Sequence, residues 1–181
     1  MKLKRYIPTY TYQSIFDIDF LALYENKIRL IFMDIDNTMV PYTSNKPTPD
    51  SLQLIESLKE MGFMVVFISN NNKERVSTFC EGLDIPCVHF ALKPLKRGFK
   101  KGLKLVRKIY QPDEVVVIGD QLMTDIVGGN KMGFTTILVS AILKKSDIFS
   151  TRINRKRERR IMKKLKRYFP KDYERLKDYV L

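Results

Sequence analysis

The sequence predicts an α/β protein with a central parallel sheet of about five strands and helices on both faces. Short runs of β-branched and aromatic residues alternate along the chain with segments in which apolar residues recur at helical spacing. The apolar runs are continuous instead of alternating, which is typical of strands covered on both faces. Strands separated by helices favour parallel pairing.

The predicted elements follow one another from residue 28 onward. The strands are expected over 28–33, 64–68, 85–91, 115–118 and 135–139. Helices are expected over 50–61, 72–81, 96–109 and 121–132. Pro49 marks the start of the first of these helices and Gly62 marks its end. Proline is common at the first position of a helix, and glycine is common just after the last one. Before residue 28, the pattern indicates at most one short helix.

Composition indicates one globular unit with a charged appendage. The chain has 181 residues, of which 44% are hydrophobic, enough for a sizeable core. We divide it into a core over 1–143 and a basic helical extension over 144–181 that packs on the core or is attached to it. No stretch has the pattern of a signal peptide or a membrane span, so a cytoplasmic protein is expected. Cys80 and Cys87 lack CxxC spacing, and we expect free thiols.

The net charge of +13 is concentrated in the extension. There, 15 Lys and Arg residues stand against 5 Asp and Glu residues, interrupted by an apolar stripe at Ile153, Ile161, Leu165 and Phe169. A basic amphipathic helix of this kind is typical of contact with an acidic membrane surface, here the inner face of the membrane. A solvated helix docked on the core by its stripe is the alternative. Nucleic-acid binding is a third interpretation, weakened by the lack of a recognised RNA motif.

Polar residues follow the apolar runs at the points where the strands should end. They are Asp34 and Asp36 after the first strand, Ser69 and Asn70 after the second, Lys93 after the third, and Asp120 and Asp125 after the fourth. The carboxyl ends of parallel strands meet at one edge of the sheet. Four carboxylates at that edge are costly unless a cation and an anionic substrate offset their charge. The sequence therefore predicts magnesium-assisted phosphoryl chemistry.

The residue types suit transfer of a phosphoryl group to the protein and then to water. Asp34, at the strand tip, is the candidate nucleophile, and Asp36 is the candidate acid and base. Mg²⁺ would be held by Asp34, the backbone carbonyl of Asp36 and Asp120, with Asp125 in support. Lys93 would hold the charges of nucleophile and substrate together.

Thr38, Ser69 and Asn70 are the candidates to bind the substrate phosphate. Each of these stretches has an ordinary structural explanation when it is taken singly: a turn around Asp34, a helix N-cap at Ser69, a solvated surface lysine at Lys93. Their joint occurrence at successive strand ends favours catalysis.

Four stretches of the chain resemble, in order, the motifs of the haloacid dehalogenase (HAD) superfamily of phosphatases. They are DIDNT at 34–38, SNNN at 69–72, LKP at 92–94 and GDQLMTD at 119–125. Longer stretches, SNNNKERV, ALKP, GDQLMTDIVGGN and TRINRKRER, resemble the YqeG branch of subfamily IIIA, which is similar to mitochondrial phosphatidylglycerophosphate phosphatase.

The resemblance implies a Rossmann-like fold, Mg²⁺ as cofactor and an aspartyl-phosphate intermediate. The implied roles are nucleophile for Asp34, general acid and base for Asp36, phosphate binding for Ser69, the motif III lysine for Lys93, and the acidic pair of motif IV for Asp120 and Asp125.

The short intervals between the motifs leave no room for a cap domain. Only 33 positions separate Asp36 from Ser69, and 24 separate Ser69 from Lys93, with helices filling much of both. An open site suits a phosphate carried on a large molecule such as a lipid. The resemblance, the missing cap and the basic extension together imply phosphatidylglycerophosphate as the preferred substrate. The alternatives are a phosphatase for a soluble or nucleic-acid phosphate and a ribosome- or RNA-associated basic binding protein.

Overall fold

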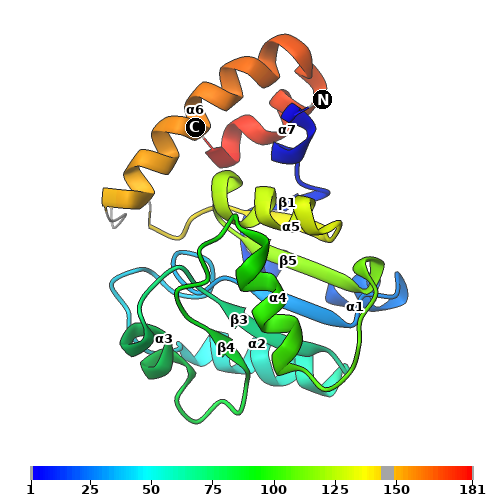
Figure 1. Ribbon diagram of the computed structural model, residues 1–181, viewed down its shortest axis with the longest axis vertical. Coiled ribbons are helices and arrows are strands. Elements are labelled where there is room, and N and C mark those ends of the chain that lie inside the picture. The colour runs from blue at the N-terminus through cyan, green and yellow to red at the C-terminus, as the bar shows by residue number, and fades with distance from the viewer. Residues whose placement is uncertain (1, 144–148, 181) are drawn as a thin grey trace.

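The computed structural model describes residues 2–143 and 149–180, without the side chains of residues 2, 149–153 and 155. Its centre is a six-stranded sheet in which all neighbours are parallel, in the order β1-β6-β5-β2-β3-β4 (Figure 1). The strands are β1 Tyr10–Tyr12, β2 Leu30–Met33, β3 Met64–Ile68, β4 Cys87–Val88, β5 Val115–Gly119 and β6 Thr135–Val139. The predicted parallel α/β fold is confirmed, with one strand more than expected.

The two edge strands differ from the predicted sheet. β1 lies in a part of the chain where no strand was predicted, and Tyr10 pairs with Ile137 of β6. β4 has two residues, whereas a strand was predicted over 85–91. Strands this short have no readable periodicity, and their pairing depends on partners distant in sequence, as in the contact between Thr9 and Thr136.

Helices cover both faces of the sheet. α1, α2 and α3 pack on one face and α4 and α5 on the other. The α-helices of the core are α1 Phe20–Glu25, α2 Pro49–Glu60, α3 Lys73–Cys80, α4 Lys96–Leu105 and α5 Val127–Met132. The helix predicted over 121–132 divides into a π-helical turn, η4 (Leu122–Ile126), and α5. Short 3₁₀ helices are η1 Lys2–Tyr6, η2 Ile15–Asp17 and η3 Pro112–Glu114.

Two helices of the extension, α6 (Phe149–Tyr168) and α7 (Pro170–Val180), lie beside η1, beyond the sheet edge formed by β1 (Figure 1). They bury an apolar cluster against the core, made of Leu122, Ile126, Leu138, Met162, Leu165, Leu176 and Val180. Leu165 of the predicted stripe is buried, and Ile161 and Phe169 are partly buried; the side chain of Ile153 is outside the described residues. Docking of the extension therefore uses the stripe and leaves most of its basic side chains outside.

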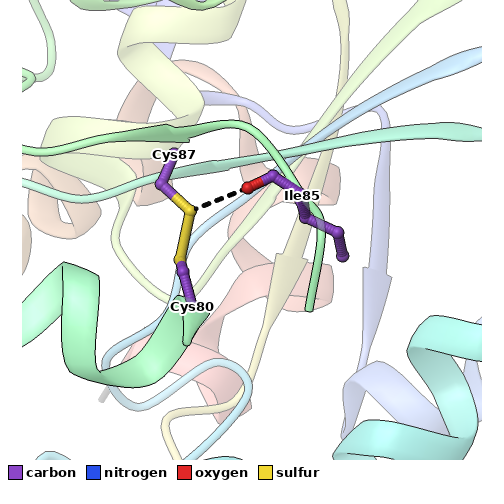
Figure 2. Close-up of a disulfide and its surroundings, with 3 residues drawn as sticks. All are labelled: Cys80, Ile85 and Cys87. Carbon is purple, nitrogen blue, oxygen red and sulfur yellow. Dashed lines mark hydrogen bonds between the residues drawn. A yellow bond between two sulfur atoms is a disulfide. The ribbon is translucent and has the colours of Figure 1, made fainter. Parts of the chain in front are cut away.

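The expectation of free thiols at Cys80 and Cys87 was wrong. Figure 2 shows the two sulfur atoms joined in a disulfide that links the last residue of α3 to the first residue of β4. The chain reverses direction between these two elements and brings together two cysteines that are seven residues apart. Spacing alone does not reveal this reversal, because it depends on the pairing of β4 with β3.

Among the described residues, no helix is both long enough and apolar enough to cross a membrane.

Candidate active site

Asp34 is held at the tip of β2 by the burial of the strand before it. All four residues of β2 are buried, and the Asp34 N–H donates to the Ile118 carbonyl at 3.0 Å, which extends the pairing with β5. Asn37 then adopts a left-handed conformation with φ of 61°, which Asn tolerates better than most residues. The Asn37 N–H donates to the Val40 carbonyl at 2.8 Å. This tight turn keeps both carboxylates of the segment at the carboxyl edge of the sheet.

The buried ammonium of Lys93 joins two of the predicted carboxylates. Its Nζ lies 2.5 Å from Asp34 Oδ1 and 2.6 Å from Asp125 Oδ1, and only 3% of the Lys93 side chain is exposed. An ammonium has three N–H donors, so one remains for a substrate oxygen after these two contacts.

The side chain of Asn70 fixes the backbone at Lys93 from both sides. Asn70 Oδ1 accepts from the Lys93 N–H at 2.6 Å, and Asn70 Nδ2 donates to the Lys93 carbonyl at 3.1 Å. Both polar atoms of the Asn70 side chain, which was predicted to bind phosphate, therefore form hydrogen bonds that position Lys93. Asn70 also lines the cavity above the cluster.

Asp34, Asp120 and Asp125 form a buried group of carboxylates. Each offers an oxygen atom within 4.8 Å of the others, which suits a single metal ion. Asp125 is oriented by Thr124, whose hydroxyl donates to Asp125 Oδ2 at 3.0 Å. Gly119 is required beneath it, since a Cβ at that position would lie 2.3 Å from Asp125 Cγ.

The electrostatics of this group favour a bound cation. Burial raises the pKa of Asp34 above its ordinary value, and Asp125 and Asp120 raise it further, while Lys93 acts in the opposite direction. Burial by itself lowers the pKa of Lys93, but the contacts with Asp125 and Asp34 outweigh it and raise that pKa. Lys93 contacts two of the three carboxylates. The hard oxygen atoms of all three fit the preference of Mg²⁺.

The two predicted hydroxyl groups lie beside the candidate nucleophile and acid. Thr38 Oγ1 donates to Asp34 Oδ2 at 3.4 Å, and Ser69 Oγ donates to Asp36 Oδ2 at 3.3 Å. Both Thr38 and Ser69 are buried. The structure thus brings together side chains that follow four strands, at one edge of the sheet. The sequence analysis predicted this arrangement. A phosphoryl group placed between Asp34 and Asp36 would come within reach of both hydroxyls.

Arg75, in the first turn of α3, is a site residue that the sequence analysis missed. Its Nη2 and Nε lie 2.6 Å and 3.0 Å from Asp36 Oδ1, and the side chain of Arg75 is 9% exposed. Arg75 also contacts Asn45 Oδ1 at 2.5 Å and the Ser44 carbonyl. One signal could have indicated it: a cation is unfavourable near a helix N-terminus unless a carboxylate compensates it.

A cavity of about 520 Å³ lies over these residues. Asp34, Asp36, Ser69 and Lys93 line it. Its remaining walls are Asn37, Tyr42, Asn70, Asn71, Leu92, Pro94, Leu95, Gln121, Thr124 and Asn154. Asn154 belongs to α6 and donates to Gln121 Oε1 at 3.2 Å, so the extension contributes to the wall of the candidate active site.

Comparison with known families and proteins gives three findings. A family model described as mitochondrial PGP phosphatase matches residues 1–144. The probable phosphatase YqeG of Bacillus subtilis (strain 168) is 40% identical over 167 residues, which are 92% of this chain and 95% of that protein. Glyceraldehyde 3-phosphate phosphatase of Pyrococcus furiosus is 27% identical over 105 residues, which are 53% of this chain and 43% of that enzyme.

Among solved structures, an uncharacterized protein from Listeria monocytogenes serotype 4b has a similar fold. Its TM-score is 0.51 at 17% identity, covering 67% of this chain and 85% of that protein. At this identity the likeness concerns the fold alone.

Arg75→Ala is expected to lower kcat for a soluble aryl phosphate by about tenfold to a hundredfold with a small change in KM, because Asp36 loses the donors that position it. Added guanidinium ion should restore part of the activity, and Arg75→Lys should retain more than Arg75→Ala. Steady-state kinetics measure each value. If guanidinium does not restore the activity of Arg75→Ala and this variant is less stable than the wild type, Arg75 serves folding only.

Asp120→Asn is expected to raise the free energy of unfolding in metal-free buffer by about 1 kcal/mol, because it removes one of three adjacent like charges. Mg²⁺ should raise the melting temperature of the wild type by binding the folded state, and this gain should shrink in the variant. Thermal unfolding with EDTA or Mg²⁺ measures both effects. Asp113→Asn, at an exposed position in η3, is the control. An equal Mg²⁺ gain in both variants would exclude Asp120 as a ligand.

Proposed function

Because the chain belongs to the mitochondrial PGP phosphatase family and is a phosphatase of the HAD type, we propose that it removes the terminal phosphate of phosphatidylglycerophosphate with Mg²⁺. The observation that carries this proposal is the contact of Lys93 Nζ with Asp34 and Asp125 beside Asp120, at the base of an open cavity. The reaction would run through a phosphoryl group on Asp34.

The first step forms a bond between a carboxylate oxygen of Asp34 and phosphorus, while the bond from phosphorus to the glycerol oxygen breaks. Asp36 gives its proton to that oxygen, and the alcohol leaves. Lys93 and Ser69 donate to the oxygens of the phosphoryl group, where negative charge gathers. Mg²⁺ held by Asp34, Asp120 and the carbonyl of Asp36, with Asp125 in support, would neutralise part of this charge.

The second step returns the protein to its initial state. Asp36, now a carboxylate, takes a proton from a water molecule, and the water oxygen attacks phosphorus. The bond between phosphorus and Asp34 breaks, and inorganic phosphate leaves. The ion pair with Arg75 suits Asp36 for this step because it holds the carboxylate at the cavity wall.

The rim of the cavity supports a lipid substrate. Leu92 and Leu95 line the cavity, yet Leu92 is 52% exposed and Leu95 is 54% exposed. Phe90, on the same segment, is 57% exposed. Apolar side chains around a polar site commonly mark contact with another apolar surface. A phosphate at the base of the cavity, with acyl chains or the membrane surface against the rim, would use both features. Such a substrate implies a protein that acts at the periphery of a membrane.

Asp36→Ala is expected to lower turnover about 100-fold or more, because proton transfer to the leaving group and from water is lost. When the Asp36→Ala variant has been exposed to an aryl phosphate and Mg²⁺ and then rapidly denatured, mass spectrometry should find a phosphoryl group on its Asp34. Asp34→Asn should carry none and should show no activity. Unchanged turnover in Asp36→Ala, with no phosphorylated Asp34, would contradict this mechanism.

The double variant Leu92→Ser/Leu95→Ser is expected to lower kcat/KM on phosphatidylglycerophosphate in vesicles about tenfold more than on a soluble aryl phosphate, because it removes apolar contact area. The control is Leu105→Ser/Ile109→Ser, two exposed apolar residues that do not line the cavity. Phosphate release measures both reactions. Wild-type protein that hydrolyses the aryl phosphate but leaves the lipid intact would refute the substrate while leaving the phosphatase assignment in place.

A further inference from the structure

A second cavity, of about 560 Å³, lies between η1 and α6 (the η1–α6 pocket). Four basic residues line it together with two tyrosines: Arg5, Tyr6, Lys163, Lys164, Arg167 and Tyr168. The described lining includes no acidic residue. Four cations around one concave surface repel each other, so an anion in the pocket would be favoured.

Two of the three acidic residues of α7 are paired with basic residues of their own helix. Arg175 pairs with Asp172 at 3.3 Å, and Lys177 pairs with Glu174 at 2.6 Å. By contrast, Lys163, Lys164 and Arg167 form no ion pair within residues 2–143 and 149–180. These three cations of the pocket are therefore not neutralised by a direct ion pair with a described residue.

Arg5 lines the pocket from η1, opposite the basic residues of α6. Its Nη2 donates to Tyr6 Oη at 3.0 Å, and a guanidinium has five N–H donors. Arg5 therefore has further donors that an oxyanion in the pocket could accept from.

We propose that the η1–α6 pocket binds a phosphate group, either in the headgroup of a membrane phospholipid or as a soluble phosphate. Arginine and lysine together supply the planar and the rotatable donors that phosphate oxygens accept. The volume lies within the usual range for a small-ligand site.

The aromatic residues of the pocket do not favour single-stranded nucleic acid. Such binding stacks bases on open aromatic rings. Tyr6 is buried, and Tyr168 is 54% exposed, with the guanidinium of Arg167 5.4 Å from the centre of its ring. The pocket therefore offers one open ring and not the series of rings on which successive bases stack.

The α6 helix connects this pocket to the candidate active site. Asn154 lines the catalytic cavity and Lys164 lines the η1–α6 pocket, and ten helical residues span about 15 Å along the axis. A phosphate bound at Lys164 would hold α6 beside the opening of the catalytic cavity. The inference does not depend on the proposed substrate, because the residues of the η1–α6 pocket are separate from the catalytic group.

The test compares two double variants of the full chain, each of which removes one Lys and one Arg charge from α6. Lys164→Gln/Arg167→Gln changes the pocket, and Lys156→Gln/Arg157→Gln changes exposed positions outside it. One arm measures sedimentation with vesicles of phosphatidylglycerol and phosphatidylcholine, with phosphatidylcholine alone as the lipid control. The other arm is calorimetric titration with inorganic phosphate in metal-free buffer.

The pocket variant is expected to bind about tenfold more weakly than the wild type in at least one arm, because it loses two of the four cations near the ligand. The Lys156→Gln/Arg157→Gln variant should stay within about threefold of the wild type in that arm. A selective loss with vesicles alone assigns the phosphate to a lipid headgroup, and a selective loss with inorganic phosphate assigns it to a soluble ligand.

Equal losses in the two variants would indicate general electrostatic attraction along α6 and would overturn the proposal. Wild-type protein that binds neither probe would overturn it as well. A further outcome is that neither arm shows binding, while the wild type retains an RNA oligonucleotide and the pocket variant does not. In that case the ligand of the pocket would be nucleic acid and not a phosphate group. Melting temperatures of both variants equal to that of the wild type would show that any loss comes from the pocket and not from unfolding.

Discussion

The buried ammonium of Lys93 between Asp34 and Asp125 is the contact on which the rest of the site depends. The carboxyl ends of β2 and β5 bring carboxylates close together where water is largely excluded, and this arrangement is costly without a cation. Lys93 reaches them from the segment after β4, and Asn70, after β3, fixes its backbone. One cation thus ties together the ends of four strands and orients the candidate nucleophile.

The candidate acid and base is held differently from the nucleophile. Asp36 pairs with Arg75 nearer the surface, where 16% of the Asp36 side chain is exposed compared with 8% for Asp34. Separating a buried ion pair is costly because it leaves each charge buried without a partner. A more exposed ion pair is separated at lower cost. This difference suits the two proposed roles, in which Asp34 would stay at one position for in-line attack and Asp36 would exchange a proton with two different partners.

The extension shows how one helix can combine packing with charge. Met162 and Leu165 of α6 are buried against the core together with Leu176 of α7, while neighbouring lysines and arginines remain exposed. The apolar residues are used for docking, so a membrane contact by α6 would depend on its basic face and not on insertion of this stripe. The same docking places Asn154 at the catalytic cavity and the lysines beside η1.

The sequence by itself determined the alternation of strands and helices and the positions of Asp34, Ser69 and Asp120 directly after strands, because burial patterns and the polarity of strand ends are local properties. Only the tertiary structure decided that β1 pairs with β6, that Cys80 joins Cys87, that Arg75 holds Asp36 across 39 residues, and that η1 and α6 enclose a basic pocket. These features are contacts between separate segments, and a contact of that kind leaves no periodic signal in either segment. Their existence depends on how the whole chain packs.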